Sequence, residues 1–169
     1  MKNASHLPPD EILGLAIRSE MDAADVYARL YDAVKNILLR KKLQFLIFEE
    51  KQHRKILEKL YIRRFPEKEL VLPEHSFLPP IKAALDKKAS VRDLFNVALK
   101  AEKRAEDFYD RAGEKAQDEN SRRILFYLSR VERSHFFMIK SEIALLDKFP
   151  DYYDVENFHA GHDFVHIGP

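Results

Sequence analysis

Four stretches of this 169-residue chain carry apolar residues at three- and four-residue steps, the spacing that places them on one face of an α-helix. Two stretches precede and two follow a proline-containing segment over residues 66–89. The pattern predicts helices from Pro9 or Asp10 to about Lys35-Asn36, from Ile37 or Lys41 to Arg64, from Val91 to Ala116, and from Ser121 to Lys148.

The chain between the second and third stretches cannot be one long helix, because prolines recur through it at 66, 73, 79 and 80. We predict a long crossover over 66–89 that contains a short helix from Pro80 to Lys87. Ser90 and Asp93 are spaced as a capping box and predict the start of the third helix. Asn36 is expected to end the first helix, since asparagine tolerates the left-handed cap.

Glutamate and histidine interrupt two of the apolar faces at the same spacing. Glu50 and His53 lie in a stripe of leucines, and Glu132 and His135 repeat the pattern. One such pair would mean little in a charged helical chain, but a further glutamate stands thirty residues before each. The two sets, related by one shift of 82 residues, are Glu20, Glu50 and His53, and Glu102, Glu132 and His135. The repeat indicates a duplicated two-helix unit.

The turns decide whether the members of each set lie at the same height. The midpoint between Glu20 and the Glu50/His53 pair falls near Lys35-Asn36, where the first turn is predicted. The midpoint of the second set falls near Gln117-Asp118, at the second predicted turn. Helices of roughly 25 residues are about 37 Å long. The six groups are therefore expected near mid-height inside a bundle.

Composition narrows the function classes. The net charge of +1 gives no reason to expect a nucleic-acid partner, and no apolar run approaches a membrane span. Without cysteine there is no disulfide, zinc-thiolate or iron–sulfur site. Residues 1–6 lack the apolar stretch of a signal peptide, which predicts a cytoplasmic protein. We expect one domain over 1–150 and a C-terminal tail over 151–169.

Four carboxylates buried together are very unfavourable without positive charge, because desolvation adds to their mutual repulsion. Two divalent cations would balance them. Oxygen and imidazole ligands without sulfur suit iron or manganese, and zinc is chemically compatible. The predicted site is therefore a dinuclear metal centre.

These residues resemble the ferritin-like superfamily, and most closely the rubrerythrin branch. The matching motifs lie within about residues 10–147 and are Glu20-x6-Tyr27, Glu50-x2-His53, Glu102-x6-Tyr109 and Glu132-x2-His135. The resemblance implies an all-α ferritin-like four-helix bundle, two antiparallel helix hairpins joined by a long crossover. It also implies that Glu50 and Glu132 bridge two iron ions, with Glu20 and His53 completing one metal site and Glu102 and His135 the other.

By the same resemblance, the chain is an oxidoreductase that reduces hydrogen peroxide or dioxygen, in oxidative-stress defence or ferrous iron oxidation. Two departures bear on this. Full rubrerythrins carry a rubredoxin-like domain with four cysteines, so electrons here are expected from an external donor protein or from ferrous iron. Rubrerythrins also have a glutamate one turn after the third-helix ligand, used in a redox-linked iron movement. Ala105 stands there, and Glu106 is rotated by about 100° from it.

Alternatives remain open at this point. The chain is otherwise an iron-binding or storage protein without turnover, or an interaction module with a vestigial site. Tyr27 and Tyr109 are core aromatics or hydrogen-bond donors to ligand carboxylates. Asp25 and Asp107 either orient the histidines or form surface salt bridges. The tail histidines 159, 162 and 166 are a secondary metal site or part of a strap. A homodimer or higher homo-oligomer is expected, with residues 136–138 packing on the crossover or a second subunit.

Overall fold

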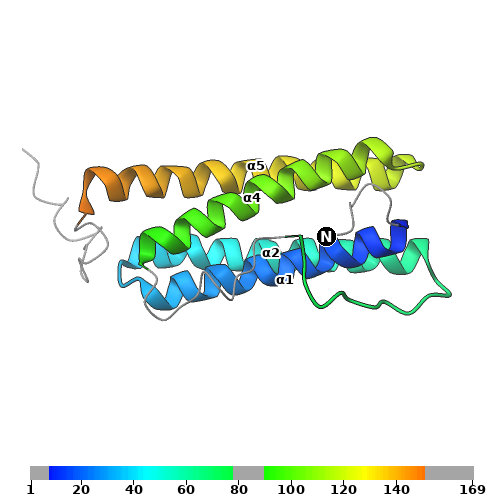
Figure 1. Ribbon diagram of the computed structural model, residues 1–169, viewed down its shortest axis with the longest axis horizontal. Helices are drawn as coiled ribbons and strands as arrows, with labels where there is room; N and C mark the ends of the chain where they lie inside the picture. The colour runs from blue at the N-terminus through cyan, green and yellow to red at the C-terminus, as the bar shows by residue number, and fades with distance from the viewer. Residues whose placement is uncertain (1–7, 78–89, 151–169) are drawn as a thin grey trace, which may run out of the picture.

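The structure, a computed structural model, describes residues 8–77 and 90–150 and consists there of four helices (Figure 1). Their bounds are α1 Pro9–Ala33, α2 Ile37–Arg64, α4 Val91–Lys115 and α5 Glu119–Lys148. The pairs α1–α2 and α4–α5 pack most extensively, and α1 also packs against α4. The predicted all-α bundle of two hairpins is confirmed. The predicted helix over 80–87 and the tail histidines lie outside the described residues.

The turn between α1 and α2 differs from the sequence prediction in its use of Asn36. Its side-chain Oδ1 accepts the backbone N–H groups of Leu38 at 3.0 Å and Leu39 at 3.1 Å, so it caps the start of α2. With a φ of −57°, Asn36 is not the left-handed end of α1 that we expected. The cap fixes the start of α2 at Ile37, the earlier of the two predicted positions.

Capping also sets the starts of the other hairpin. Ser90 and Asp93 form the predicted capping box, each side chain accepting the backbone N–H of the other residue. Asp118 accepts the N–H of Ser121 at 2.8 Å, so α5 begins at Glu119, two residues before the predicted start. Asp118 had been expected only as a turn residue, and its role as an N-cap explains the difference.

The apolar core is divided into two main clusters along the bundle. One includes Leu30, Leu43, Leu46, Phe95 and Ile139, and the other includes Ile17, Leu57, Leu60, Leu125 and Leu128. The leucine stripe predicted around Glu50 and His53 is buried, as Leu43, Leu46, Leu57 and Leu60 show. Tyr31 and Leu99 are only partly buried and pack against the first cluster from its edge.

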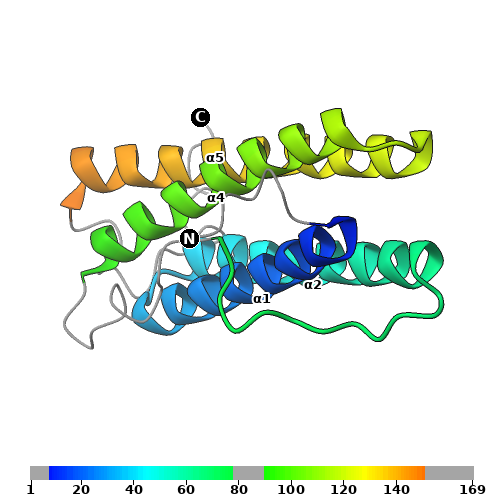
Figure 2. The same ribbon diagram turned by 45° about the vertical axis from the view of Figure 1, so that its right-hand side comes forward.

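The described part of the crossover runs back along α1 and ends beside the α1–α4 side of the bundle (Figures 1 and 2). Lys68 pairs with the Asp10 carboxylate at 2.7 Å. At Gly14 the crossover backbone approaches so closely that a Cβ would lie 3.1 Å from the Val71 carbonyl oxygen. These contacts hold the segment against the outer face of α1.

Two further findings concern surfaces. Met138 packs against the first apolar cluster of its own chain, whereas Phe137 is exposed. Among the helices that the structure describes, none has both the length and the apolar run needed to cross a membrane.

Candidate metal centre

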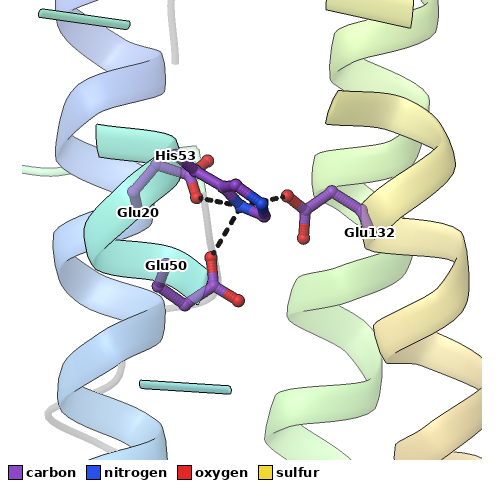
Figure 3. A group of neighbouring side chains, drawn as sticks. All are labelled: Glu20, Glu50, His53 and Glu132. Atoms are coloured by element: carbon purple, nitrogen blue, oxygen red, sulfur yellow. Dashed lines mark hydrogen bonds and ion pairs between the residues drawn. The ribbon is translucent and has the colours of Figure 1, made fainter. Parts of the chain in front are cut away.

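The six residues predicted as ligands lie together between the two apolar clusters. Each is at most 2% exposed, and all four helices contribute. Figure 3 shows four of them, with the His53 ring directed toward carboxylates from α1, α2 and α5. The midpoint argument therefore predicted their common height correctly. They fall into two groups, and within each group one ligand atom per residue lies within 4.8 Å of the others. The first group is Glu20, Glu50, His53 and Glu132. The second group is Glu50, Glu102, Glu132 and His135.

His53 contacts three carboxylates through its Nδ1 atom. Glu132 Oε1 lies at 3.1 Å, Glu20 Oε2 at 3.3 Å and Glu50 Oε2 at 3.5 Å (Figure 3). Two of these glutamates come from the same hairpin as His53, and Glu132 comes from the other. The first group is therefore completed only when the hairpins are docked.

His135 has the matching set of contacts. Its Nδ1 atom lies 3.1 Å from Glu50 Oε1, 3.5 Å from Glu132 Oε2 and 3.7 Å from Glu102 Oε2. Glu50 and Glu132 thus present one oxygen to each histidine, whereas Glu20 contacts only His53 and Glu102 only His135 among the two rings. The rings themselves are stacked, with centroids 5.6 Å apart and planes 20° from parallel.

Two buried tyrosines connect the hairpins at the glutamates that are not shared. Tyr27 of α1 donates its hydroxyl proton to Glu102 of α4, and Tyr109 of α4 donates to Glu20 of α1. The sequence left open whether these tyrosines were core aromatics or donors to the carboxylates. They are both, since each is at most 1% exposed and each hydroxyl has a carboxylate acceptor.

The other polar candidates lie outside the centre. Asp107 pairs with Lys103 at 2.8 Å and Asp25 is exposed, so neither orients a histidine. Glu106 is buried but faces α5, where Arg133 binds it at 2.6 Å. Ala105 lines a small cavity beside the carboxylates.

Burial and charge divide the four glutamates into two kinds. Burial, together with the charges of Glu132 and Glu50, raises the pKa of Glu20 well above its ordinary value. Burial and the charge of Glu132 raise the pKa of Glu102 in the same way. Burial also opposes ionisation of Glu50 and Glu132, but their contacts with both histidines outweigh it and lower the pKa of each.

The histidines respond in the opposite sense. Burial alone would lower their pKa values, but three carboxylates around each ring outweigh it, raising the pKa of His53 above its ordinary range and that of His135 to about 12. In the metal-free cluster these shifts favour protonated histidines and neutral Glu20 and Glu102 beside ionised Glu50 and Glu132. The shifts therefore all act to reduce the net negative charge of the metal-free cluster or to pair it with positive charge.

Hydrogen bonding within the cluster is incomplete, which is the observation that tests whether the residues fit a metal. Within the described part of the chain, the buried polar side-chain atoms without a hydrogen-bond partner are Glu50 Oε1 and Oε2, His53 Nε2, Glu102 Oε2, Glu132 Oε1 and His135 Nδ1. All belong to the predicted ligands. Buried polar atoms that make no hydrogen bond are costly even beside an opposite charge, and these are the donor atoms that a divalent transition metal prefers. The donor set therefore fits a metal site.

Small residues next to the glutamates were not singled out from the sequence. Ser19, Ala23, Ala101 and Ala105 line a cavity of about 10 Å³ together with the carboxylates. The internal repeat held the signal, since the 82-residue shift relates Ser19 to Ala101 and Ala23 to Ala105. Small side chains therefore flank the unshared glutamate at equivalent positions in both halves.

The fold and the site define a four-helix carboxylate–histidine bundle protein that can bind metal. Comparison with known families is more specific: the rubrerythrin model matches residues 11–143, and the chain belongs to the rubrerythrin family. It is similar to a solved structure of a hypothetical protein from Pyrococcus furiosus, with 33% identity and a TM-score of 0.77. That match covers 86% of this chain and 94% of the other. Comparison with curated proteins gives no match.

Proposed function

We propose that the protein binds two iron ions, one in each residue group, with Glu50 and Glu132 bridging them. The observation that carries the proposal is that these two glutamates belong to both groups. Glu20 and His53 would complete one site, and Glu102 and His135 the other. Manganese and zinc suit the same atoms chemically, so the identity of the metal is part of the test.

We further propose that the centre is an oxidoreductase of the peroxidase or ferroxidase type. Bound iron supplies the electrons that reduce hydrogen peroxide or dioxygen and the Lewis acidity that assists the reduction. Because this chain has no cysteine, the reducing electrons would come from an external donor protein or from ferrous iron. Membership of the rubrerythrin family supports this reaction class.

The residues of the chain have separate tasks in this proposal. The tyrosine hydroxyls hold the carboxylates of Glu20 and Glu102 in place, as partners of metal ligands commonly do. The apolar clusters on either side keep bulk water from the carboxylates, which strengthens their electrostatic contacts. Glu20 and Glu102, whose pKa values are raised, would release their protons when they bind metal.

Two measurements test the proposal in sequence. Elemental analysis after anaerobic loading with ferrous iron should give two iron ions per chain, and at most one would contradict a dinuclear site. Stopped-flow absorption should then show oxidation of the ferrous protein by peroxide or dioxygen. Full loading without reaction with either oxidant would remove the enzyme proposal and leave iron binding or storage.

A further inference from the structure

We infer that small molecules reach the metal centre between α1 and α4, and that Phe77 covers this route. The inference rests on the proposed function, because it assigns the access path of that same centre. It concerns Phe77, Ala23 and Ala101, which lie outside the six-residue cluster.

The α1–α4 side is where small side chains lie next to the carboxylates. The cavity there is lined by Ser19 and Ala23 of α1 and by Ala101 and Ala105 of α4. Its volume of about 10 Å³ is close to the smallest that holds one water molecule. A ligand of a few atoms therefore needs only a small displacement of these side chains to enter.

Three of the residues that line this cavity are glutamates with carboxylate oxygens that make no hydrogen bond. Glu50, Glu102 and Glu132 are among its lining residues, and each has at least one buried oxygen without a hydrogen-bond partner. All three side chains are at least 98% buried. The cavity therefore leads to the atoms that are expected to hold metal, which distinguishes it from a gap between small residues.

Larger side chains fill the bundle along its axis. Leu46 and Ile139 lie in the apolar cluster on one side of the centre, and Leu57 and Leu128 lie in the cluster on the other. Each of these four side chains is at most 1% exposed. Close-packed interiors of this kind leave few voids as large as a water molecule, so the path along the bundle axis is the less favourable one.

Phe77 packs against the outer side of this small-residue region. Its side chain contacts the Ala23–Ala101 cluster and is itself partly buried. The ring stacks on Phe108 of α4, with centroids 4.2 Å apart and planes 16° from parallel. Figures 1 and 2 show the described part of the crossover ending beside α1 and α4. The ring is therefore placed to restrict entry to ligands that are small or that displace it.

Binding of azide to the oxidised, iron-loaded protein tests the route without relying on turnover. Azide is a small anion, and its binding to ferric iron is followed by the appearance of a charge-transfer absorption band. Phe77→Ala removes the cover and should raise the azide association rate several-fold. Phe48→Ala removes an exposed phenylalanine from α2, away from the α1–α4 side, and should leave the rate unchanged.

A narrowing variant gives the opposite expectation. Ala23→Val adds two methyl groups at the cavity wall and should slow azide association relative to wild type. Equal rates in wild type, Phe77→Ala and Phe48→Ala, with full iron loading and an intact band, would overturn the inference and leave the proposed function standing. Absence of bound iron in the wild type would remove the proposed function and the inference with it. Circular dichroism and iron content of each variant identify any effect that arises from misfolding.

Discussion

The two hairpins are alike at the centre of the bundle and differ one turn away. The 82-residue shift relates every predicted ligand and both tyrosines of one hairpin to those of the other. The buried residues one helical turn from these ligands differ in charge and polarity between the two hairpins. Glu106 in α4 is buried and paired with Arg133 at 2.6 Å, whereas the equivalent residues in the first hairpin are Ala24 and Lys51. Ala24 is also buried, but it has no charge to satisfy.

A second pair of positions shows the same difference. Ser129 donates its hydroxyl proton to Asp110 at 2.6 Å across the α4–α5 interface. The equivalent residues in the first hairpin are Ile47 and Ala28. The α4–α5 hairpin thus makes two side-chain contacts near the centre that the equivalent residues of the α1–α2 hairpin cannot make. The comparison shows that a symmetric ligand set does not require a symmetric helix interface.

The largest effect is expected from breaking the symmetry at a shared ligand. Glu50→Ala or Glu132→Ala should greatly reduce iron occupancy at both positions, because each carboxylate belongs to both residue groups. His53 belongs to one group only, so His53→Ala should mainly empty one of the two metal positions. Elemental analysis after anaerobic loading measures this difference. Retention of two ions per chain by all three variants would show that the ligand assignment is wrong.

The second largest effect is expected on stability as a function of pH. The metal-free protein should lose stability as pH rises, whereas the iron-loaded protein should not. The pKa values of Glu20 and Glu102 are raised on folding by burial and neighbouring carboxylates. A group with a raised pKa contributes its full stability below its unfolded pKa and loses it as pH rises through the folded value. The two glutamates therefore weaken the metal-free protein progressively above their ordinary pKa of 4.5.

The histidines act in the same direction at higher pH. Their pKa values are raised above 6.5 by the surrounding carboxylates, against the effect of burial, so their contribution decreases as pH rises beyond that value. The lowered pKa values of Glu50 and Glu132 act oppositely, and stability is lost when acid protonates them below 4.5. The melting temperature of the metal-free protein should therefore fall between pH 5 and pH 8.

The loaded protein should not show this fall, because metal binding requires deprotonated ligands and strengthens as pH rises. Thermal melts of both forms across pH 5 to 8 provide the measurement. Parallel curves for the two forms would contradict the directions of these pKa shifts in the metal-free cluster.

Removing one tyrosine hydroxyl should have a smaller and symmetric effect. Tyr27→Phe and Tyr109→Phe each deprive one unshared glutamate of its donor, which should weaken metal binding on the order of 10–100-fold. Tyr31→Phe is the control, since the Tyr31 hydroxyl contacts Gln44 at the surface. Competition with a chelator of known affinity measures all three variants. Affinities equal to the control would mean that the hydroxyls do not support the ligands.

The smallest effect concerns the asymmetric interface. Ser129→Ala removes the hydrogen bond to Asp110 and should cost about 1 kcal/mol of unfolding free energy. Ser134→Ala, at an exposed position on α5, should stay within about 0.5 kcal/mol of wild type. Urea denaturation of the metal-free proteins compares them. Iron stoichiometry should be unchanged in both, because neither side chain belongs to the cluster.

The sequence predicted the parts of the molecule that depend on periodicity. Apolar spacing placed the four helices within a few residues, and the spacing between ligands and turns predicted that Glu20 would lie level with His53. The sequence did not predict the features that depend on which of several backbone groups a polar side chain binds. Asn36 suits either the end of one helix or the start of the next, and only the free N–H groups of Leu38 and Leu39 decide between them.

Contacts between hairpins were the second part that the sequence left open. Helical periodicity indicates that Tyr109 faces inward, but not which glutamate its hydroxyl reaches across the bundle. Periodicity likewise did not show that Glu106 pairs with Arg133, a residue of a different helix. The crossover was recognised by its prolines, whereas the contact of Phe77 with Ala23 required coordinates.

The presence of Glu132 in the same group as Glu20, Glu50 and His53 has a consequence for the kinetics of folding. Contacts within each hairpin close short stretches of chain, whereas this group assembles only after two hairpins meet across the crossover. If docking follows the rate-limiting transition state, iron stabilises an interaction that is absent from that state. Iron should then slow unfolding while leaving the folding rate nearly unchanged. Denaturant-jump kinetics with and without iron would measure both rates. A folding rate that changes with iron would show instead that the hairpins have already docked in the transition state.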